Sequence, residues 1–112
     1  MDSKLTKDAE FMILSLYKVY LERIRDGNLK RKAVEFMDFN YLQSELFPTW
    51  PMPDIVSTAA ELNGTGYIKK YQNHGGIVLL PAGIAYCENA YGFSISEVVG
   101  SFLKLKSLLF PS

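Results

Sequence analysis

Apolar side chains recur at helical spacing from the start of the chain, which predicts a long first helix over residues 6–25. Thr6 is a suitable N-cap, and the acidic Asp8 and Glu10 would lie in the first turn, at the positive end of the helix dipole. The polar positions form only a narrow stripe, so the apolar arc is wider than one packed face requires. We expect this helix either to be buried within its own domain or to contact a second subunit through Tyr17 and Tyr20.

Two shorter helices are expected next. Residues 28–37 have the pattern of a short helix whose first turn, residues 30–32, is entirely basic. Asp38 is placed to cap another helix. The three prolines within residues 48–53 exclude regular structure, and the last of them suits the first turn of a helix that runs to Leu62.

The clearest pattern in the chain is a helix followed at once by a hairpin. The Asn63-Gly64 pair is expected to end the helix, because these residues readily adopt the left-handed conformation. Two β-branched and aromatic runs, residues 67–71 and 77–80, are separated by a short polar and glycine-rich segment. This spacing predicts an antiparallel hairpin with a polar tip, and Pro81 is expected to start the helix after it.

The last element has the strongest local signature. Ser94 and Glu97 match the capping box, which predicts a helix over residues 94–110. Its apolar residues follow a heptad-like seam that includes Val98, Phe102, Leu105 and Leu109. This seam, together with the apolar first helix, favours a homodimer through the terminal helices; the alternative is that both helices pack on their own domain.

These elements predict a mainly α protein with a small antiparallel β-hairpin, an α+β fold forming one domain over residues 1–112. No stretch approaches the roughly 18 apolar residues that would span a bilayer, and the chain starts without an apolar signal core. The single cysteine, Cys87, excludes an intramolecular disulfide and suits a reducing compartment. We therefore expect a cytoplasmic protein that has no membrane partner.

The segments around the hairpin resemble winged helix-turn-helix proteins. Residues 62–68, LNGTGYI, are similar to the junction between the recognition helix and the wing in that family, and residues 77–84, IVLLPAGI, are similar to its wing strand. The chain thus resembles small bacterial winged-helix proteins such as the MarR-like and PadR-like regulators and related Firmicute or phage proteins. The resemblance implies a helix-turn-helix, wing and following helix over residues 28–92. Leu80 departs from the family, which has a threonine before the helix that follows the wing.

The resemblance also implies that the helix of residues 53–62 lies in the major groove of DNA and that the wing contacts the flanking backbone or minor groove. The expected DNA contacts come from the helix, the wing and the basic segment, namely Ser57, Thr58, Lys69, Lys70, Gln72, Asn73, His74, Lys30, Arg31 and Lys32. The basic segment has the alternative of being only a solvated charged surface. The outward side of the helix would also carry Asp54 and Glu61, which phosphates repel.

Charge and motifs leave two functions open. The 12 Lys and Arg residues balance the 12 Asp and Glu residues, so a DNA-binding surface would have to be a local patch. The leading hypothesis is a homodimeric DNA-binding regulator of transcription, and the alternative is a winged-helix interaction module that does not bind DNA. The sequence contains no hydrolase, P-loop or zinc-protease motif, and only one histidine. We therefore expect neither enzymatic activity nor a metal or cofactor.

Overall fold

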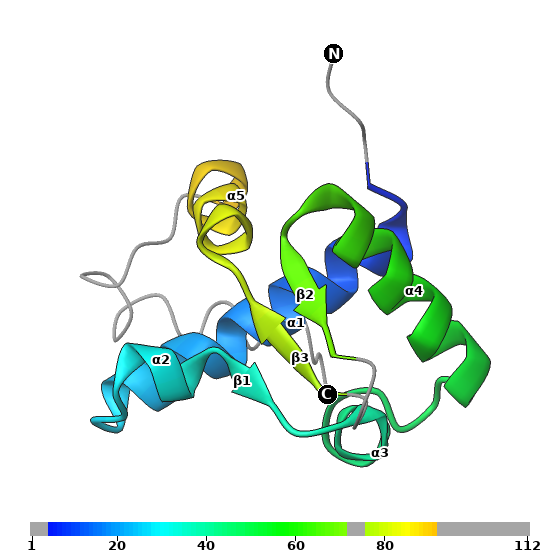
Figure 1. Cartoon of the computed structure of the whole chain (residues 1–112), viewed down its shortest axis with the longest axis horizontal. Helices are drawn as coiled ribbons and strands as arrows, with labels where there is room; N and C mark the ends of the chain where they lie inside the picture. Colours follow the sequence, from blue (N-terminus) through cyan, green and yellow to red (C-terminus); the bar gives the residue numbers. More distant parts are fainter. Residues whose placement is uncertain (1–4, 72–75, 92–112) are drawn as a thin grey trace.

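The structure is a computed structural model that describes residues 5–71 and 76–91 (Figure 1). These residues form a mainly helical α+β fold with a three-stranded antiparallel sheet, which confirms the expected class. The elements in chain order are α1 (Lys7–Arg25), α2 (Lys30–Ala33), β1 (Glu35–Phe36), α3 (Phe39–Tyr41), the π-helical turn η1 (Leu42–Leu46), α4 (Met52–Thr65), β2 (Ile68–Lys70), β3 (Ile77–Leu79) and α5 (Pro81–Tyr91). The predicted helix over residues 94–110, with Val98, Phe102, Leu105 and Leu109, lies outside the described residues.

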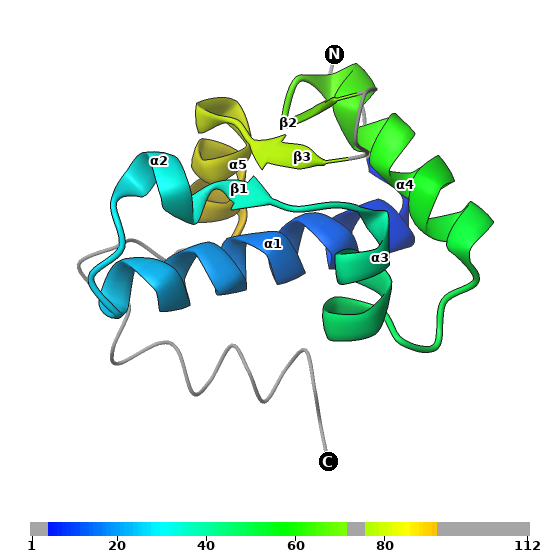
Figure 2. The same cartoon turned by 60° about the horizontal axis from the view of Figure 1, so that its bottom comes forward.

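Helix α1 forms the base of the fold. It lies beneath the sheet, with α2 toward one end and α4 toward the other (Figure 2). Its start is capped as expected, because the Thr6 hydroxyl accepts a hydrogen bond of 3.1 Å from the backbone N–H of Ala9. Its end is also where the sequence predicted it, at Asp26, before Gly27 with φ of 94°.

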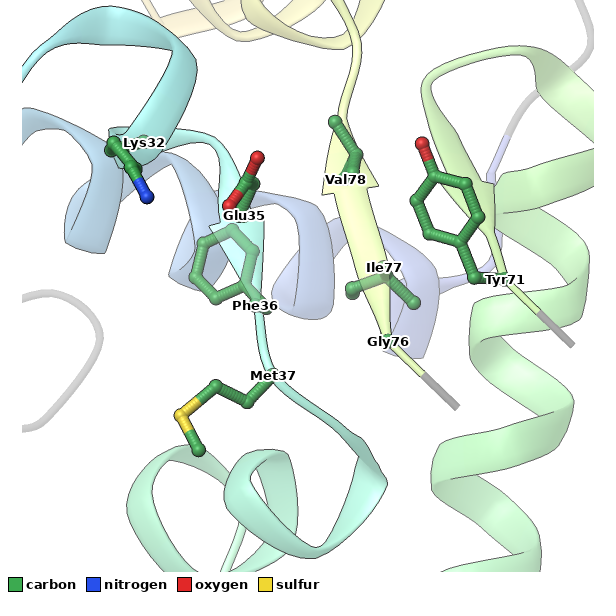
Figure 3. A pocket seen from close by; sticks show the side chains of 8 residues that line it. All are labelled: Lys32, Glu35, Phe36, Met37, Tyr71, Gly76, Ile77 and Val78. Carbon is green, nitrogen blue, oxygen red and sulfur yellow. The ribbon is translucent and has the colours of Figure 1, made fainter. Parts of the chain in front are cut away.

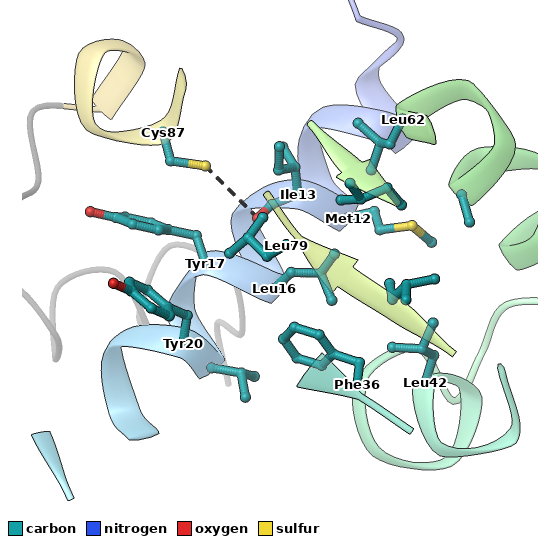
Figure 4. Packing of buried hydrophobic residues seen from close by; sticks show 14 of the residues in the cluster. Met12, Ile13, Leu16, Tyr17, Tyr20, Phe36, Leu42, Leu62, Leu79 and Cys87 are labelled. Carbon is teal, nitrogen blue, oxygen red and sulfur yellow. Dashed lines mark hydrogen bonds between the residues drawn. The ribbon is translucent and has the colours of Figure 1, made fainter. Parts of the chain in front are cut away.

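The wide apolar arc of α1 is explained by burial within the chain. Tyr17 is 0% exposed and Tyr20 is 2% exposed, and the two rings stack with centroids 6.2 Å apart (Figure 4). Residues on neighbouring turns, among them Met12 and Leu16, are also fully buried. The prediction that Tyr17 and Tyr20 face a second subunit is therefore wrong, because their side chains are enclosed by the chain itself.

The sheet has the strand order β1-β3-β2. Phe36 pairs with Ile77, and Ile68 pairs with Leu79, and all four side chains point into the core. On the opposite face, the outer face, Glu35, Val78 and Lys69 form a row across the three strands. The alternation of inward and outward side chains follows directly from the pleat.

Strand β1 corrects the prediction of one helix over residues 28–37. Helix α2 ends at Ala33, and the carbonyl of Val34 already accepts a 2.9 Å hydrogen bond from the N–H of Leu79. An extended backbone at Glu35 and Phe36 lets the chain pair with β3 and buries the Phe36 ring. A strand of two residues is too short to show a periodic pattern in the sequence. Its extended conformation is therefore determined by pairing with β3.

The guanidinium of Arg23, near the end of α1, holds this segment in place. It donates to the backbone carbonyls of Ala33 and Glu35, and its second terminal nitrogen lies 3.2 Å from the Tyr41 hydroxyl. Its central carbon also lies 4.7 Å from the centroid of the Phe36 ring. One side chain therefore joins α1 to the end of α2, to β1 and to α3.

Helix α3 begins as predicted, since the Asp38 carboxylate accepts a 2.8 Å hydrogen bond from the N–H of Tyr41. The helix then widens into the π-helical turn η1, where the N–H of Phe47 donates to the carbonyl of Leu42 at 2.8 Å. This arrangement buries the Phe47 ring, which lies 4.9 Å from the Trp50 ring.

Helix α4 is longer than predicted. It passes through Asn63 and Gly64 and ends at Thr65, and Gly66 takes the left-handed conformation with φ of 85°. The Asn63 side chain instead accepts a 3.0 Å hydrogen bond from the N–H of Lys70 in β2. The helix and the first strand of the hairpin are thus joined within one short turn.

The predicted hairpin and the helix after it are present. Strands β2 and β3 pair antiparallel, and α5 begins at Pro81. Helix α5 approaches the start of β2 closely at Gly83, where a β-carbon would overlap with the carbonyl oxygen of Tyr67. The rings of Tyr67 and Tyr86 stack across the same contact, 4.8 Å apart.

Candidate functional site

The solvent-facing side of α4 is the first part of the predicted DNA surface. Ser57, Ala60 and Gly64 are exposed on it, and so is Asp54. Thr58 is only 6% exposed and lies on the buried side of the helix, so its predicted place on the DNA-contacting surface is wrong. Successive residues of an α-helix are rotated by about 100° around its axis, so Thr58 lies on the same side of α4 as the buried residues, and Ser57 does not.

Glu61 does not lie free on this surface. Its carboxylate accepts a 3.0 Å hydrogen bond from the backbone N–H of Thr6 and a 2.8 Å hydrogen bond from the Thr6 hydroxyl. A carboxylate at the N-terminus of α1 also meets the positive end of the helix dipole. Glu61 therefore has a structural role, which leaves Asp54 as the exposed acid on the outer side of α4.

The two lysines of strand β2 come directly after α4 in the chain. Lys69 is exposed on the outer face of the sheet, and its ammonium lies 5.6 Å from the centroid of the Tyr71 ring. Lys70 is partly buried. The other predicted wing contacts, Gln72, Asn73 and His74, lie outside the described residues.

The three consecutive cations of the basic segment do not share one site. Lys32 lines a groove of about 400 Å³ on the outer face of the sheet, with Tyr71 on the opposite wall (Figure 3). We call this the sheet groove; its other lining residues are Glu35, Phe36, Met37, Gly76, Ile77 and Val78. Lys30 and Arg31 line a different pocket, beside α5. Of the three cations, only Lys32 therefore lies at the groove whose opposite wall carries Tyr71.

The basic segment and α4 also lie at opposite edges of the sheet. Helix α2 adjoins the β1 edge and α4 adjoins the β2 edge (Figure 1). The width of three strands therefore separates Ser57 from the exposed cations of α2, which are Lys30, Arg31 and Lys32. A single surface made of α4 and the β2–β3 hairpin therefore does not include Lys30 and Arg31.

Among residues 5–71 and 76–91, no group of three or more His, Cys, Asp or Glu side chains is arranged to hold a metal ion. Within the same ranges, no helix combines the length and the apolar character that crossing a bilayer demands. Cys87 is fully buried, with its sulfur 3.9 Å from the carbonyl oxygen of Ile13 (Figure 4).

The buried thiol leads to a prediction about pH. Burial, with a smaller contribution from the Glu88 carboxylate, raises the pKa of Cys87 far above its ordinary value. The unfolded chain releases the thiol proton near pH 8.5 and the folded chain does not, so above this pH the unfolded state binds fewer protons. The contribution of Cys87 to the free energy of unfolding is therefore full at pH 7 and is expected to fall by about 1.4 kcal/mol per pH unit above about pH 9.

Urea denaturation at pH 7, 9 and 10, for the native chain and for Cys87→Ala, measures this effect. The variant is expected to be less stable at pH 7 but to lose less stability as the pH rises. Equal slopes for the two proteins would contradict the assignment.

Comparison with known proteins adds no relative: no family model, curated protein or solved structure matches this chain. Function is therefore inferred from the arrangement of the chain's own residues. Besides the order of the elements, three surface features bear on it, namely the outer side of α4, the cations of β2 and the sheet groove.

Proposed function

We propose that the protein is a DNA-binding protein of the winged helix-turn-helix type, a transcriptional regulator that acts as a homodimer. The observation that carries the proposal is the order of the elements. Two helices joined by a turn, α3 with η1 and then α4, lead directly into the β2–β3 hairpin. Strand β1 precedes them and adds to the hairpin in the order β1-β3-β2. This order supports the proposal, because the second helix of a helix-turn-helix lies in the major groove of DNA.

The outer side of α4 suits a close approach to DNA. Ser57, Ala60 and Gly64 recur at spacings of three and four residues, so they lie along one side of the helix, and all are small. Small side chains let a helix backbone come near the groove, but they offer few groups that read base edges. We therefore propose that α4 contributes fit and position, and contributes little direct reading of sequence.

Positive charge for the phosphates comes from the wing. Lys70 is joined to the end of α4 through its backbone bond to Asn63, and Lys69 is exposed beside it. In a chain with no net charge, such a local pair has to supply most of the attraction, so binding should weaken steeply as salt is added. The homodimer remains a proposal based on the seam of Val98, Phe102, Leu105 and Leu109, since Tyr17 and Tyr20 are buried.

Fluorescence anisotropy with a random-sequence duplex, at low and then physiological salt, tests the proposal. We expect salt-sensitive binding, and we expect Ser57→Glu to weaken it roughly tenfold, because the new carboxylate would face phosphates. Asn89→Glu is the matched control, since it adds the same charge at an exposed position of α5. Equal affinities for Ser57→Glu and Asn89→Glu would remove α4 from the contact surface, and no binding at low salt would reject DNA as the ligand.

A protein-interaction module is the second candidate, and a specific observation favours it. Helix α4 contains no lysine or arginine, and its exposed side carries Asp54. On the sheet groove, Met37 is 72% exposed and Tyr71 is 40% exposed, which is typical of residues that contact a partner. Absence of DNA binding at low salt would support this candidate.

A further inference from the structure

A second cavity lies beside α5, away from the proposed DNA surface. It has a volume of about 500 Å³, within the range of pockets that hold small molecules. We call it the α2–α5 pocket; its lining residues are Tyr20, Lys30, Arg31, Val34, Val78, Leu79, Leu80, Pro81, Ile84, Ala85 and Glu88. None of them belongs to α4 or β2. What this pocket binds is therefore a separate question from DNA binding.

The walls of the pocket are mostly apolar and are only partly covered by the chain. Val34, Leu80 and Ile84 are half-buried, and Pro81 and Ala85 are exposed. Apolar side chains left open in a concave site gain free energy when an apolar ligand removes them from water. The body of the ligand is therefore expected to be apolar.

Charged side chains lie among the residues that line the pocket. Lys30 and Arg31 are both exposed, and neither forms an ion pair with a carboxylate in the part of the chain that the structure describes. Among the described residues of the lining, Glu88 is the one acidic residue. The net charge of these lining side chains is therefore positive. A guanidinium and an ammonium together suit a carboxylate or sulfonate group on a ligand.

The Tyr20 side chain completes the set of polar groups. Tyr20 is 2% exposed and is one of the residues that line the pocket. Figure 4 shows this hydroxyl pointing away from the middle of the core cluster. Burial and then the nearby Glu88 carboxylate raise the pKa of Tyr20, which keeps the hydroxyl protonated as a donor. Because Tyr20 lines the pocket, its hydroxyl can donate a hydrogen bond to an acceptor on a bound ligand.

We propose that the α2–α5 pocket binds a small amphipathic anion, with its apolar body against Val34, Leu80 and Ile84 and its acidic group held by Lys30 and Arg31. The Tyr20 hydroxyl donates a hydrogen bond to the same ligand. This assignment is independent of DNA binding, because it uses no residue of α4 or β2, the elements proposed to contact DNA.

Two fluorescent probes that differ in one group provide the test on the full chain. 8-Anilino-1-naphthalenesulfonate has the two ring systems of N-phenyl-1-naphthylamine together with a sulfonate. We expect saturable binding of the sulfonate probe at one site per chain, and weaker binding of the uncharged probe. Lys30→Gln combined with Arg31→Gln should weaken the sulfonate probe about tenfold and leave the uncharged probe within about twofold.

The matched control removes two cations elsewhere. Lys7→Gln combined with Arg25→Gln changes the net charge equally, at exposed positions of α1 that do not line the pocket. It should leave both affinities unchanged. An equal loss in this control, or no loss in the Lys30 and Arg31 variant, would overturn the proposal, as would failure of the sulfonate probe to saturate.

Two further variants test the apolar walls of the pocket and the Tyr20 hydroxyl. Ala85→Trp places an indole at an exposed position of the lining and should weaken both probes at least tenfold. Tyr20→Phe removes only the hydroxyl and should weaken the sulfonate probe about threefold. Near-ultraviolet circular dichroism of each variant verifies that the folded core is kept. Unchanged binding of both probes to folded Ala85→Trp would place the probes elsewhere and overturn the assignment.

Discussion

Gly83→Ala is expected to lower the free energy of unfolding by about 3 kcal/mol. A β-carbon at this position would overlap with the backbone carbonyl oxygen of Tyr67 and would also press on the Leu79 side chain. The carbonyl cannot move aside freely, because it accepts a 2.9 Å hydrogen bond from the N–H of Leu80. Helix α5 would have to shift away from the start of β2. Urea denaturation measures the change.

Gly64→Ala is the matched control, because it makes the same chemical change in another helix. Gly64 lies within α4, and nothing lies within 4 Å of the position that a β-carbon would take. Alanine there is expected to raise the free energy of unfolding by about 0.5–1 kcal/mol, through its better helix propensity. A loss of stability with Gly64→Ala would contradict the backbone described for α4. No loss with Gly83→Ala would contradict the close contact between α5 and Tyr67.

Arg23→Met is expected to lower the free energy of unfolding by about 2–3 kcal/mol. Methionine keeps the length and the apolar stem of the side chain but cannot donate to the carbonyls of Ala33 and Glu35 or to the Tyr41 hydroxyl. It also loses the cation above the Phe36 ring. The segment that holds β1 against β3 would lose its connection to α1.

Two variants distinguish the geometry of Arg23 from its charge. Arg23→Lys keeps the charge, but a single ammonium cannot reach acceptors on three elements, so less than half of the lost stability should return. Arg25→Met removes a neighbouring charge that is exposed and lies 3.5 Å from Asp26, and it should cost less than about 0.5 kcal/mol. Full recovery with lysine would reduce the role of Arg23 to charge alone.

The parts of the fold that the sequence predicted are those determined by neighbouring residues. Thr6 and Asp38 cap their helices through residues three positions away, and Pro81 starts α5 by its own geometry. The β2–β3 hairpin also follows from adjacent runs. Strand β1 could not be predicted in this way, because Glu35 and Phe36 are extended only through pairing with strand β3, about forty residues further on.

The candidate site was harder to predict, because it depends on which side of a helix faces the core. The apolar arc of α1 is so wide that periodicity could not separate a buried Tyr17 from one in a dimer interface. Thr58 is polar and neighbours the exposed Ser57 in sequence, yet it is buried in α4 together with Ile55 and Leu62. Residues 30–32 are consecutive, yet two of them line one pocket and the third lines another.

The contact between Glu61 and Thr6 has a consequence for how the chain folds during synthesis. The first turn of α1 is made early, but the carboxylate that binds its backbone N–H and hydroxyl lies 55 residues later. A nascent chain that ends before residue 61 lacks this partner, so the start of α1 is open to fraying until α4 has been made and docked. The two helices are thereby expected to become ordered in one cooperative step, after α4 has been synthesised.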